Sequence, residues 1–271
     1  MNYRHAFHAG NFSDCMKHAL LIALLDALQK KPGGLFVLDT HAGIGQYDLD
    51  QGPATRTGEW RAGIGRLLDY APLEMDRYVG LIRQLGLYPG SPRIIRALLR
   101  AQDRMACCEL HPEDAVTLRR LFARDPQVAV HARDAWEAIG ALLPPKEKRG
   151  LVLIDPPFEA ADDFAQMAEA LRRGHARARN FVFAAWYPIK HRAPVREFQT
   201  QMKQSGIRDI IAADMWLRPT LDASRLNGCG LLVINPPFGF AEEAQAMLTA
   251  LSLTLADGPD GGCEITRLVD E

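Results

Sequence analysis

Two short stretches of the chain share a layout that could serve amine chemistry. Residues 150–159 read GLVLIDPPFE and residues 230–239 read GLLVINPPFG. The lone pair of an aromatic exocyclic amine is delocalised into its ring, so the amine is a poor nucleophile. Asp155 and the backbone carbonyl of Pro156 can accept its two hydrogens and stabilise the positive charge that grows as nitrogen attacks a methyl carbon. The first stretch is therefore a candidate for amine methylation.

The residues around Asp155 suit a rigid site for a nucleobase. Pro156 and Pro157 cannot continue a strand or donate a backbone hydrogen bond, so the chain leaves the sheet stiffly. Phe158 offers a face for base stacking, worth roughly 1–3 kcal/mol per base. A base in folded RNA must first be unstacked, at a cost of about a few kcal/mol. We therefore take Asp155, Pro156 and Phe158 as the candidate catalytic residues.

A cofactor site is predicted where the first expected strand ends. That strand runs into LDTHAGIGQY, which places Asp39, His41 and Gly43 at its tip. Glycines at such a tip let the backbone turn sharply and let a ligand approach the main chain. The pattern is not G-x-G-x-x-G, which disfavours a dinucleotide.

Two further acids follow later strands. Glu109 can accept hydrogen bonds from ribose hydroxyls, and Asp134 from an adenine amine. Each acid alone is more typical of a helix cap. Together they favour a nucleoside cofactor, because the carboxyl ends of parallel strands meet at one edge of the sheet. With no phosphate-binding lysine loop, S-adenosylmethionine fits better than ATP or NAD.

The pattern of apolar runs predicts the elements that position these residues. Alternating strands and helices indicate an α/β fold with a mostly parallel, Rossmann-like sheet and an antiparallel last strand. Strands are expected at residues 35–40, 105–110, 128–132, 151–155, 181–186, 209–217 and 230–235. Helices are expected at residues 14–31, 92–102, 112–123, 134–143, 162–173, 195–205 and 241–251.

One interval interrupts this alternation. Residues 48–89 show helix-like spacing and no convincing strand, which predicts a small inserted helical subdomain. The main domain would then comprise residues 1–47 and 90–271, with residues 1–12 as an arm. After the insertion, Ser91 is expected to cap a helix that opens with Pro92. The first long helix is expected to have Ser13 or Asp14 as its N-cap.

Bulk composition excludes several classes. The 271 residues carry a net charge of −1, so any surface for nucleic acid must be local. Five cysteines without C-x-x-C spacing are typical of free thiols in a reducing compartment. The apolar run at residues 19–28 is too short to span a bilayer, and the N-terminal histidines match no zinc spacing. We therefore expect a cytoplasmic monomer that binds no metal and no membrane.

Several motifs together resemble one family. In order, these are YRHAFHAGNFSDCMKH, LDTHAGIGQY, RTGEW, YPGSP, ELHP, IDPPFE, WYPI and INPPF. They resemble the bacterial 23S ribosomal RNA adenine-N6 methyltransferases of the RlmJ type over nearly the whole chain. The resemblance implies S-adenosylmethionine as methyl donor and protein-free 23S rRNA as substrate. It also implies a catalytic Asp155, and a cofactor pocket lined by Lys17, His18, His41, Ser91, Glu109, Asp134 and Ala135.

The resemblance also bears on the substrate. It places Tyr3 near the incoming base, with the N-terminal stretch as a lid over the pocket; an ordinary ordered arm is the alternative. Phe158 replaces the usual tyrosine, which keeps stacking but loses a hydroxyl, and Ala135 replaces an expected glycine. Trp186 and Tyr187 end the fifth strand, where they could flank the base or simply pack.

Other features leave alternatives open. Basic residues cluster at 172–179 and 190–196 and along the helix at 93–100, and each cluster is either a phosphate contact or a solvated face. Besides an RNA adenine methyltransferase, the sequence allows methylation of another base amine or of DNA adenine, or a non-catalytic RNA-binding protein. The second corner, at Asn235, is expected to lie at the opposite edge of the sheet, because its strand should be antiparallel.

Overall fold

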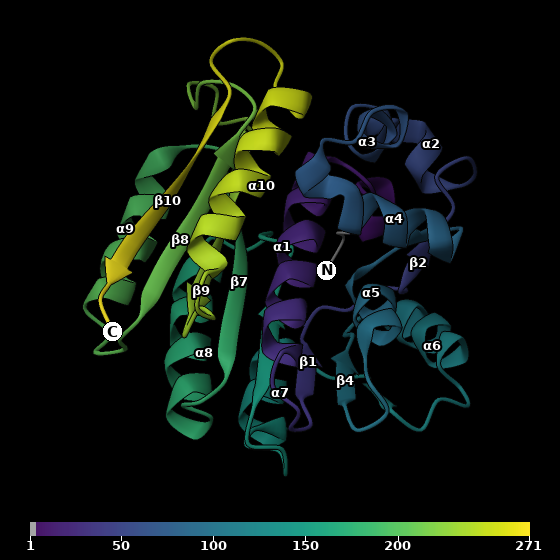
Figure 1. The fold of residues 1–271 in the computed structure, drawn as a ribbon, viewed down its shortest axis with the longest axis vertical. Helices are drawn as coiled ribbons and strands as arrows, with labels where there is room; N and C mark the ends of the chain where they lie inside the picture. The colour runs from purple at the N-terminus through teal and green to yellow at the C-terminus, as the bar shows by residue number, and fades with distance from the viewer. Residues whose placement is uncertain (1–3) are drawn as a thin grey trace.

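The computed structural model describes residues 4–271 and contains one large sheet. Its eight strands lie in the order β10-β8-β9-β7-β6-β1-β4-β5 (Figure 1). Their bounds are β1 Phe36–Asp39, β4 Arg104–Cys108, β5 Val128–His131, β6 Gly150–Ile154, β7 Val182–Ile189, β8 Ile210–Trp216, β9 Gly228–Ile234 and β10 Gly262–Val269.

Strand direction confirms the predicted fold class. The neighbours β5, β4, β1, β6 and β7 pair in parallel, whereas β9 is antiparallel to both β7 and β8. The strand before Asn235 is thus antiparallel, as predicted, and it forms a hairpin with β8. One expectation needs correction, because β9 is not the last strand: β10 pairs antiparallel with β8 at the edge of the sheet. Residues 262–269 are mostly half-buried and include charged side chains, so they lack an apolar strand pattern.

Helices cover both faces of the sheet, and alternation along each strand supplies the two cores. Odd-numbered positions such as Val37 in β1 pack under α1 and α10, whereas Phe36 and Leu38 pack under α7 and α8. The helices are α1 Phe12–Gln29, α5 Ser91–Leu98, α6 Pro112–Leu121, α7 Ala135–Leu142, α8 Asp163–Arg177, α9 Arg192–Lys203 and α10 Phe240–Leu255.

The helix α1 is buried along most of its length, on the face of the sheet where it lies beside α10 (Figure 1). Its N-cap is Asn11, whose side chain accepts hydrogen bonds from the backbone amides of Ser13 and Asp14. The predicted caps, Ser13 and Asp14, are therefore wrong by two or three residues. Because Asn11 caps the helix, the side chain of Asp14 is available for the site described below.

Short helices occupy the interval that interrupts the sheet pattern. They are α2 Pro53–Thr57, α3 Ile64–Asp69 and α4 Asp76–Leu85, with 3-10 turns at Glu59–Arg61 and Leu73–Met75. The two-stranded pair of β2 (Gln46–Tyr47) and β3 (Tyr88–Pro89) brackets them. Their apolar residues join the same core as α1 and α10. A separate inserted subdomain at 48–89, with a main domain of 1–47 and 90–271, stays a prediction.

The second Pro-Pro corner lies where the antiparallel direction predicts. The Asn235 side chain donates hydrogen bonds to the carbonyls of Arg179 and Phe181, at the chain's entry into β7. This is the edge opposite to the carboxyl ends of β1 and β6. Phe238 is fully exposed, and α10 begins two residues later. The corner is a stiff exit into α10.

Candidate active site

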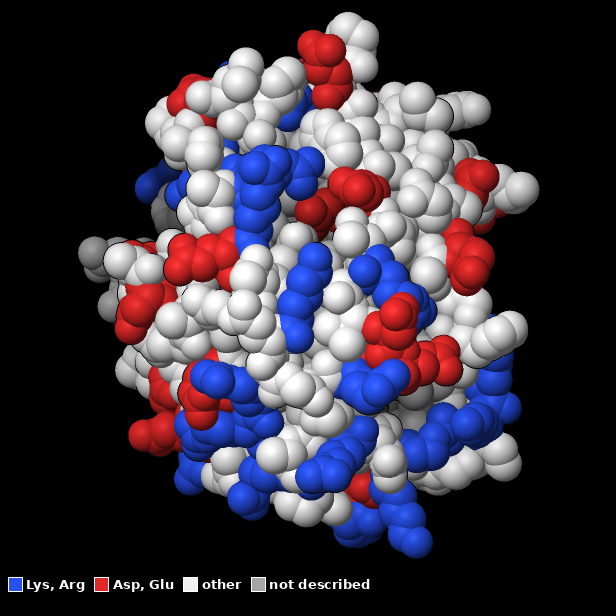
Figure 2. All heavy atoms as spheres, turned by 90° about the vertical axis from the view of Figure 1, so that its left-hand side faces the viewer, with Lys and Arg blue, Asp and Glu red and all other residues white. Residues whose placement is uncertain are grey.

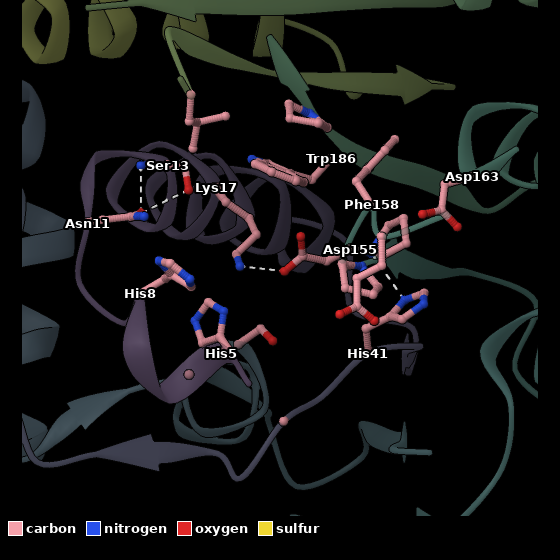
Figure 3. Close-up of a pocket in the computed structure, with 18 of the residues that line it drawn as sticks. His5, His8, Asn11, Ser13, Lys17, His41, Asp155, Phe158, Asp163 and Trp186 are labelled. Carbon is pink, nitrogen blue, oxygen red and sulfur yellow. Dashed lines mark hydrogen bonds and ion pairs between the residues drawn. The ribbon is translucent and has the colours of Figure 1, made fainter. Parts of the chain in front are cut away.

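A cavity of about 850 Å³ lies along the carboxyl ends of the parallel strands. Its walls come from the N-terminal segment, α1, the loops after β1, β4, β5 and β6, and the end of β7. Figure 3 shows Lys17 and Asp155 pointing toward each other across it, with Phe158 and Trp186 to one side and His41 to the other. The fold thus brings residues from distant parts of the sequence to one site.

The catalytic candidates line this cavity directly after β6. Asp155, Pro156 and Phe158 are all part of its wall. Phe158 has a φ of 51°, which is the left-handed region that non-glycine residues seldom occupy. Its ring meets Phe164 and Trp186 edge-on, with centroids 4.8 and 5.9 Å away. Phe158 thus contributes a partly buried aromatic ring to the cavity wall, next to Trp186.

Lys17 reaches Asp155 from the first turns of α1. Its Nζ lies 2.5 Å from Oδ2 of Asp155 and 3.0 Å from Oδ1 of Asp14. Burial opposes the charged form of Lys17, but the two carboxylates outweigh it and hold its pKa well above the usual range. Sequence reasoning assigned Lys17 to the cofactor. Its contacts place it on the carboxylate of Asp155, and it also lines the cavity, so the cofactor assignment stays a prediction.

Asp14 joins the N-terminal segment to this ion pair. Its fully buried side chain accepts hydrogen bonds from the backbone amide of Gly10 and from Nε2 of His5. Burial alone would raise its pKa, but the neighbouring His5 and Lys17 hold it well below the usual range. Residues 5–10 are therefore fastened over the same helix that carries Lys17.

Glu59, from the RTGEW motif, fastens the segment from the other side. It accepts hydrogen bonds from His8 Nδ1 at 3.0 Å and from Asn11 Nδ2 at 3.0 Å. Further along, Arg4 donates to Glu113 at 2.6 Å, on the first turn of α6. The segment thus crosses from the 3-10 turn at Glu59–Arg61 toward the loop after β4. Tyr3, predicted near the substrate, lies outside the described residues.

Glu109 and Gly43 form the part of the cavity at the tips of β1 and β4. The Glu109 carboxylate accepts from the amides of Gly43 and His111, at 2.8 and 2.7 Å. A carboxylate has about four acceptor sites, so two of them stay available for ribose hydroxyls. Gly43 has a φ of +60°, and a side chain there would collide with the Tyr47 hydroxyl.

Asp134 and Ala135 lie beside them at the tip of β5. Asp134 is the N-cap of α7, with Oδ1 accepting from the amides of Trp136 and Glu137. Both residues line the cavity. The helix-cap interpretation of Asp134 is thus correct, and it leaves Oδ2 without a hydrogen-bond partner among the described residues.

Two histidines in the wall are neutral. Burial lowers the pKa of His41 to about 4 and that of His18 to about 3. His41 Nδ1 accepts from the Asp155 amide at 3.3 Å, which ties the tip of β1 to the catalytic corner. His18 Nδ1 meets the Tyr88 hydroxyl at 3.1 Å, while its Nε2 has no hydrogen-bond partner within residues 4–271.

Asp39 and Ser91 are paired at the base of the site. Ser91 Oγ donates to Asp39 Oδ2 at 2.7 Å, so Ser91 is not the expected cap, and Gly90 precedes α5 instead. Ser91 lines the cavity, whereas Asp39 is fully buried behind it. Burial raises the pKa of Asp39 to about 7. Asp39 is therefore placed to hold the Ser91 side chain, and it does not itself reach the cavity.

The predicted substrate contact of Tyr187 is wrong, because the side chain points away from the cavity. Tyr187 is fully buried on the face covered by α8 and α9, where its hydroxyl donates to Asp214 at 2.6 Å. The preceding residue, Trp186, faces α1 and lines the cavity. Neighbouring residues of a strand point to opposite faces, so this alternation was the signal that could have separated the pair.

No membrane-spanning helix is found among residues 4–271. Over the same residues, no group of three or more His, Cys, Asp or Glu side chains is arranged to hold a metal ion.

Comparison with known proteins identifies the family. The family described as "Ribosomal RNA large subunit methyltransferase D, RlmJ" matches residues 32–269. The chain belongs to the RlmJ family. The family and its members are named as methyltransferases, which agrees with the activity that the cavity and the Asp-Pro-Pro-Phe corner indicate. The protein is therefore a methyltransferase.

Individual relatives of the RlmJ family match the chain from end to end. A Haemophilus influenzae protein named "Ribosomal RNA large subunit methyltransferase J" is 40% identical, and the alignment covers 100% of each chain. An Escherichia coli protein of the same name is 35% identical with the same coverage. A crystal structure of a Legionella pneumophila protein, 33% identical, superposes with a TM-score of 0.88 over 96% of this chain and 98% of that one.

Proposed function

We propose that the protein transfers a methyl group from S-adenosylmethionine to N6 of an adenine in 23S ribosomal RNA, with protein-free rRNA in the cytoplasm as substrate and a monomer as the active form. The observation that carries the proposal is the corner after β6. There, one carboxylate, one backbone carbonyl and one aromatic ring share a cavity wall with residues suited to a nucleoside. The names of the full-length relatives support the rRNA substrate.

The cavity wall fits the methyl donor at the tips of β1, β4 and β5. His18 Nε2 is buried there without a hydrogen-bond partner among residues 4–271, and Gly43 leaves room that a side chain would fill. Glu109 and Asp134 are positioned to accept from the ribose and the adenine amine. When bound, S-adenosylmethionine supplies an electrophilic methyl group. Glu109, Asp134, Ser91 and His18 would hold it.

The chain's own groups prepare the amine on the other side of that methyl group. Asp155 and the Pro156 carbonyl accept the two N6 hydrogens, which favours a lone pair directed at the methyl carbon. Both groups also stabilise the positive charge on nitrogen as the bond forms, and the pre-oriented acceptors need no rearrangement during the step. Lys17 holds the carboxylate in place through its 2.5 Å contact with Oδ2.

Phe158 is proposed to stack on the target base. We expect Phe158→Ala to lower kcat/KM for rRNA by about tenfold or more, since base stacking contributes roughly 1–3 kcal/mol. Phe158→Tyr keeps the ring and should remain close to wild type. Steady-state methylation with labelled donor measures the effect, and calorimetry should find donor affinity unchanged. Equal activity of the alanine and tyrosine variants would contradict a stacking role.

The reaction itself is tested by product analysis. Protein-free 23S rRNA, assembled large subunits, genomic DNA and total protein are incubated with labelled S-adenosylmethionine, and the nucleosides are separated. The proposal predicts N6-methyladenosine in the protein-free 23S rRNA. Label in DNA, in protein, or on another base would contradict it. Binding of rRNA without any transfer would instead favour a non-catalytic RNA-binding protein.

A further inference from the structure

The cavity continues past the catalytic corner, on the side away from the donor site. In the sheet, β7, β9 and β8 follow β6 in the direction opposite to β1, β4 and β5. Lys190 lies just after β7, Arg218 just after β8 and Arg225 just before β9, and all three line the same cavity. One end of the cavity therefore carries Glu109 and Asp134 with Arg133 beside them, and the other end carries these three cations with Asp257.

A buried asparagine fixes the loop between β8 and β9 at this end. The Asn227 side chain, fully buried, donates to the carbonyls of Lys190 at 2.8 Å and Asp222 at 2.7 Å. Its backbone amide donates to the Ile189 carbonyl. These bonds hold residues 222–227 against the end of β7, so Lys190 and Arg225 project from one anchored unit.

The three cations differ in what they already bind. Arg218 donates to the Asp257 carboxylate and to the Leu226 carbonyl, and so joins the loop to the end of α10. Lys190 and Arg225 are exposed and form no ion pair within the described part of the chain. Asp222, which feels the charge of Arg225, uses its Oδ1 to accept from Ser224. Two cations therefore remain available for a ligand.

We propose that Lys190 and Arg225 bind the phosphates that flank the target adenine. This inference rests on the proposed function and adds a binding surface to it. A base turned out of its stack into the corner at Asp155 must bring its two flanking phosphates to the cavity rim. Contacts to phosphates fix the register of a nucleic acid without reading its bases. The anchored loop would thus set how the RNA strand crosses the site.

A second basic region of the surface, far from the cavity, provides the control for this proposal. Exposed cations lie at the carboxyl ends of α8 and α9 and in the loops that follow, and they include Arg173, Arg179, Lys203 and Arg208. Figure 2 shows Lys and Arg gathered over the lower part of the face that carries α9 and β10. This region belongs to the amino-terminal edge of the parallel strands, about 17–20 Å from the cavity edge for a typical strand. Its cations cannot reach phosphates beside a base held at Asp155.

The test compares two matched double variants, Lys190→Ala/Arg225→Ala and Lys203→Ala/Arg179→Ala. Each removes one exposed lysine and one exposed arginine. Binding of protein-free 23S rRNA transcript is measured by filter retention over a range of salt concentrations, and methylation of the same transcript is measured in parallel. Losing two single-strand phosphate contacts should weaken binding about tenfold near 0.15 M salt and reduce the slope of log K against log salt by about 1.4.

We expect Lys190→Ala/Arg225→Ala to raise the KM for the transcript about tenfold, with kcat and donor affinity unchanged. The charge-conserving variant Lys190→Arg/Arg225→Lys should behave as wild type. The control variant should match wild type in KM and slope. An unchanged slope in the first variant, or equal losses in both variants, would overturn the phosphate contacts. A wild-type enzyme that binds the transcript but does not methylate it would instead overturn the proposed function, and the binding comparison would still decide the role of the loop.

Discussion

The variant Asp155→Asn is expected to lower kcat for methyl transfer to protein-free 23S rRNA by about 10²–10³-fold. An amide keeps the size of the carboxylate, but it offers one oxygen acceptor and carries no negative charge. It therefore stabilises the cationic nitrogen of the transition state far less. Removal of a single pre-oriented electrostatic group typically costs this much in other enzymes. Single-turnover transfer of a labelled methyl group measures the chemical step.

A matched control separates chemistry from folding. Asp162→Asn makes the same change on an exposed side chain that bonds Gln166 on the first turn of α8. It should leave kcat and the melting temperature close to wild type. Affinity for S-adenosylmethionine, measured by calorimetry, should survive in both variants, because the donor contacts come from other loops. Near-normal turnover of Asp155→Asn would show that Asp155 is not the acceptor.

Lys17→Met is expected to reduce both stability and activity. Without the ammonium, the part-buried Asp155 loses the cation it pairs with, and the fully buried Asp14 retains its contact with His5 but no lysine. Removing one partner of a buried ion pair typically costs about 3–5 kcal/mol. The free energy of unfolding in urea should fall by that amount. Methyl transfer should fall by about 10²-fold, because the Asp155 carboxylate, the proposed acceptor of the amine hydrogens, loses the contact that positions it.

The pH dependence of this loss follows from the direction of the two pKa shifts. The pKa of Asp14 is depressed in the folded protein, so its contribution is present above an unfolded value of about 3.9 and is lost as pH falls further. The pKa of Lys17 is raised, so its contribution is complete below about 10.4 and is lost as pH rises further. The stability gap between wild type and Lys17→Met should therefore be widest between these limits and narrow on either side.

Two controls accompany Lys17→Met. Arg77→Met removes the cation of an exposed pair with Asp26, on the same helix as Lys17, and should cost less than about 1 kcal/mol. Lys17→Met/Asp14→Asn also removes the buried negative charge that lost Lys17, and it should regain part of the stability without regaining activity. If Lys17→Met and Arg77→Met unfold at the same urea concentration, the buried ion pair does not stabilise the fold.

Local sequence determined most of the sheet and the location of the chemistry. Apolar runs and turn residues identified seven strands. Chain order placed Asp155 at the same sheet edge as Gly43, Glu109 and Asp134, and it placed Asn235 at the opposite edge. These inferences succeed because strand periodicity and the direction of βαβ connections are properties of short segments. The edge strand β10 was missed for the same reason, since its stability comes from pairing with β8 rather than from an apolar pattern.

Only the tertiary structure decided which side chains meet. The sequence separates Lys17 and Asp155 by 138 residues, and nothing local shows that the lysine contacts the Asp155 carboxylate. Glu59 binding to His8, and Asn227 fixing Lys190 to the β8–β9 loop, are likewise set by packing. Such contacts depend on how α1, the short helices α2 to α4 and the β8–β9 hairpin pack at one edge of the sheet. The sequence by itself determined which chemistry the chain carries, and the packing of those elements decided which partner each charged group has.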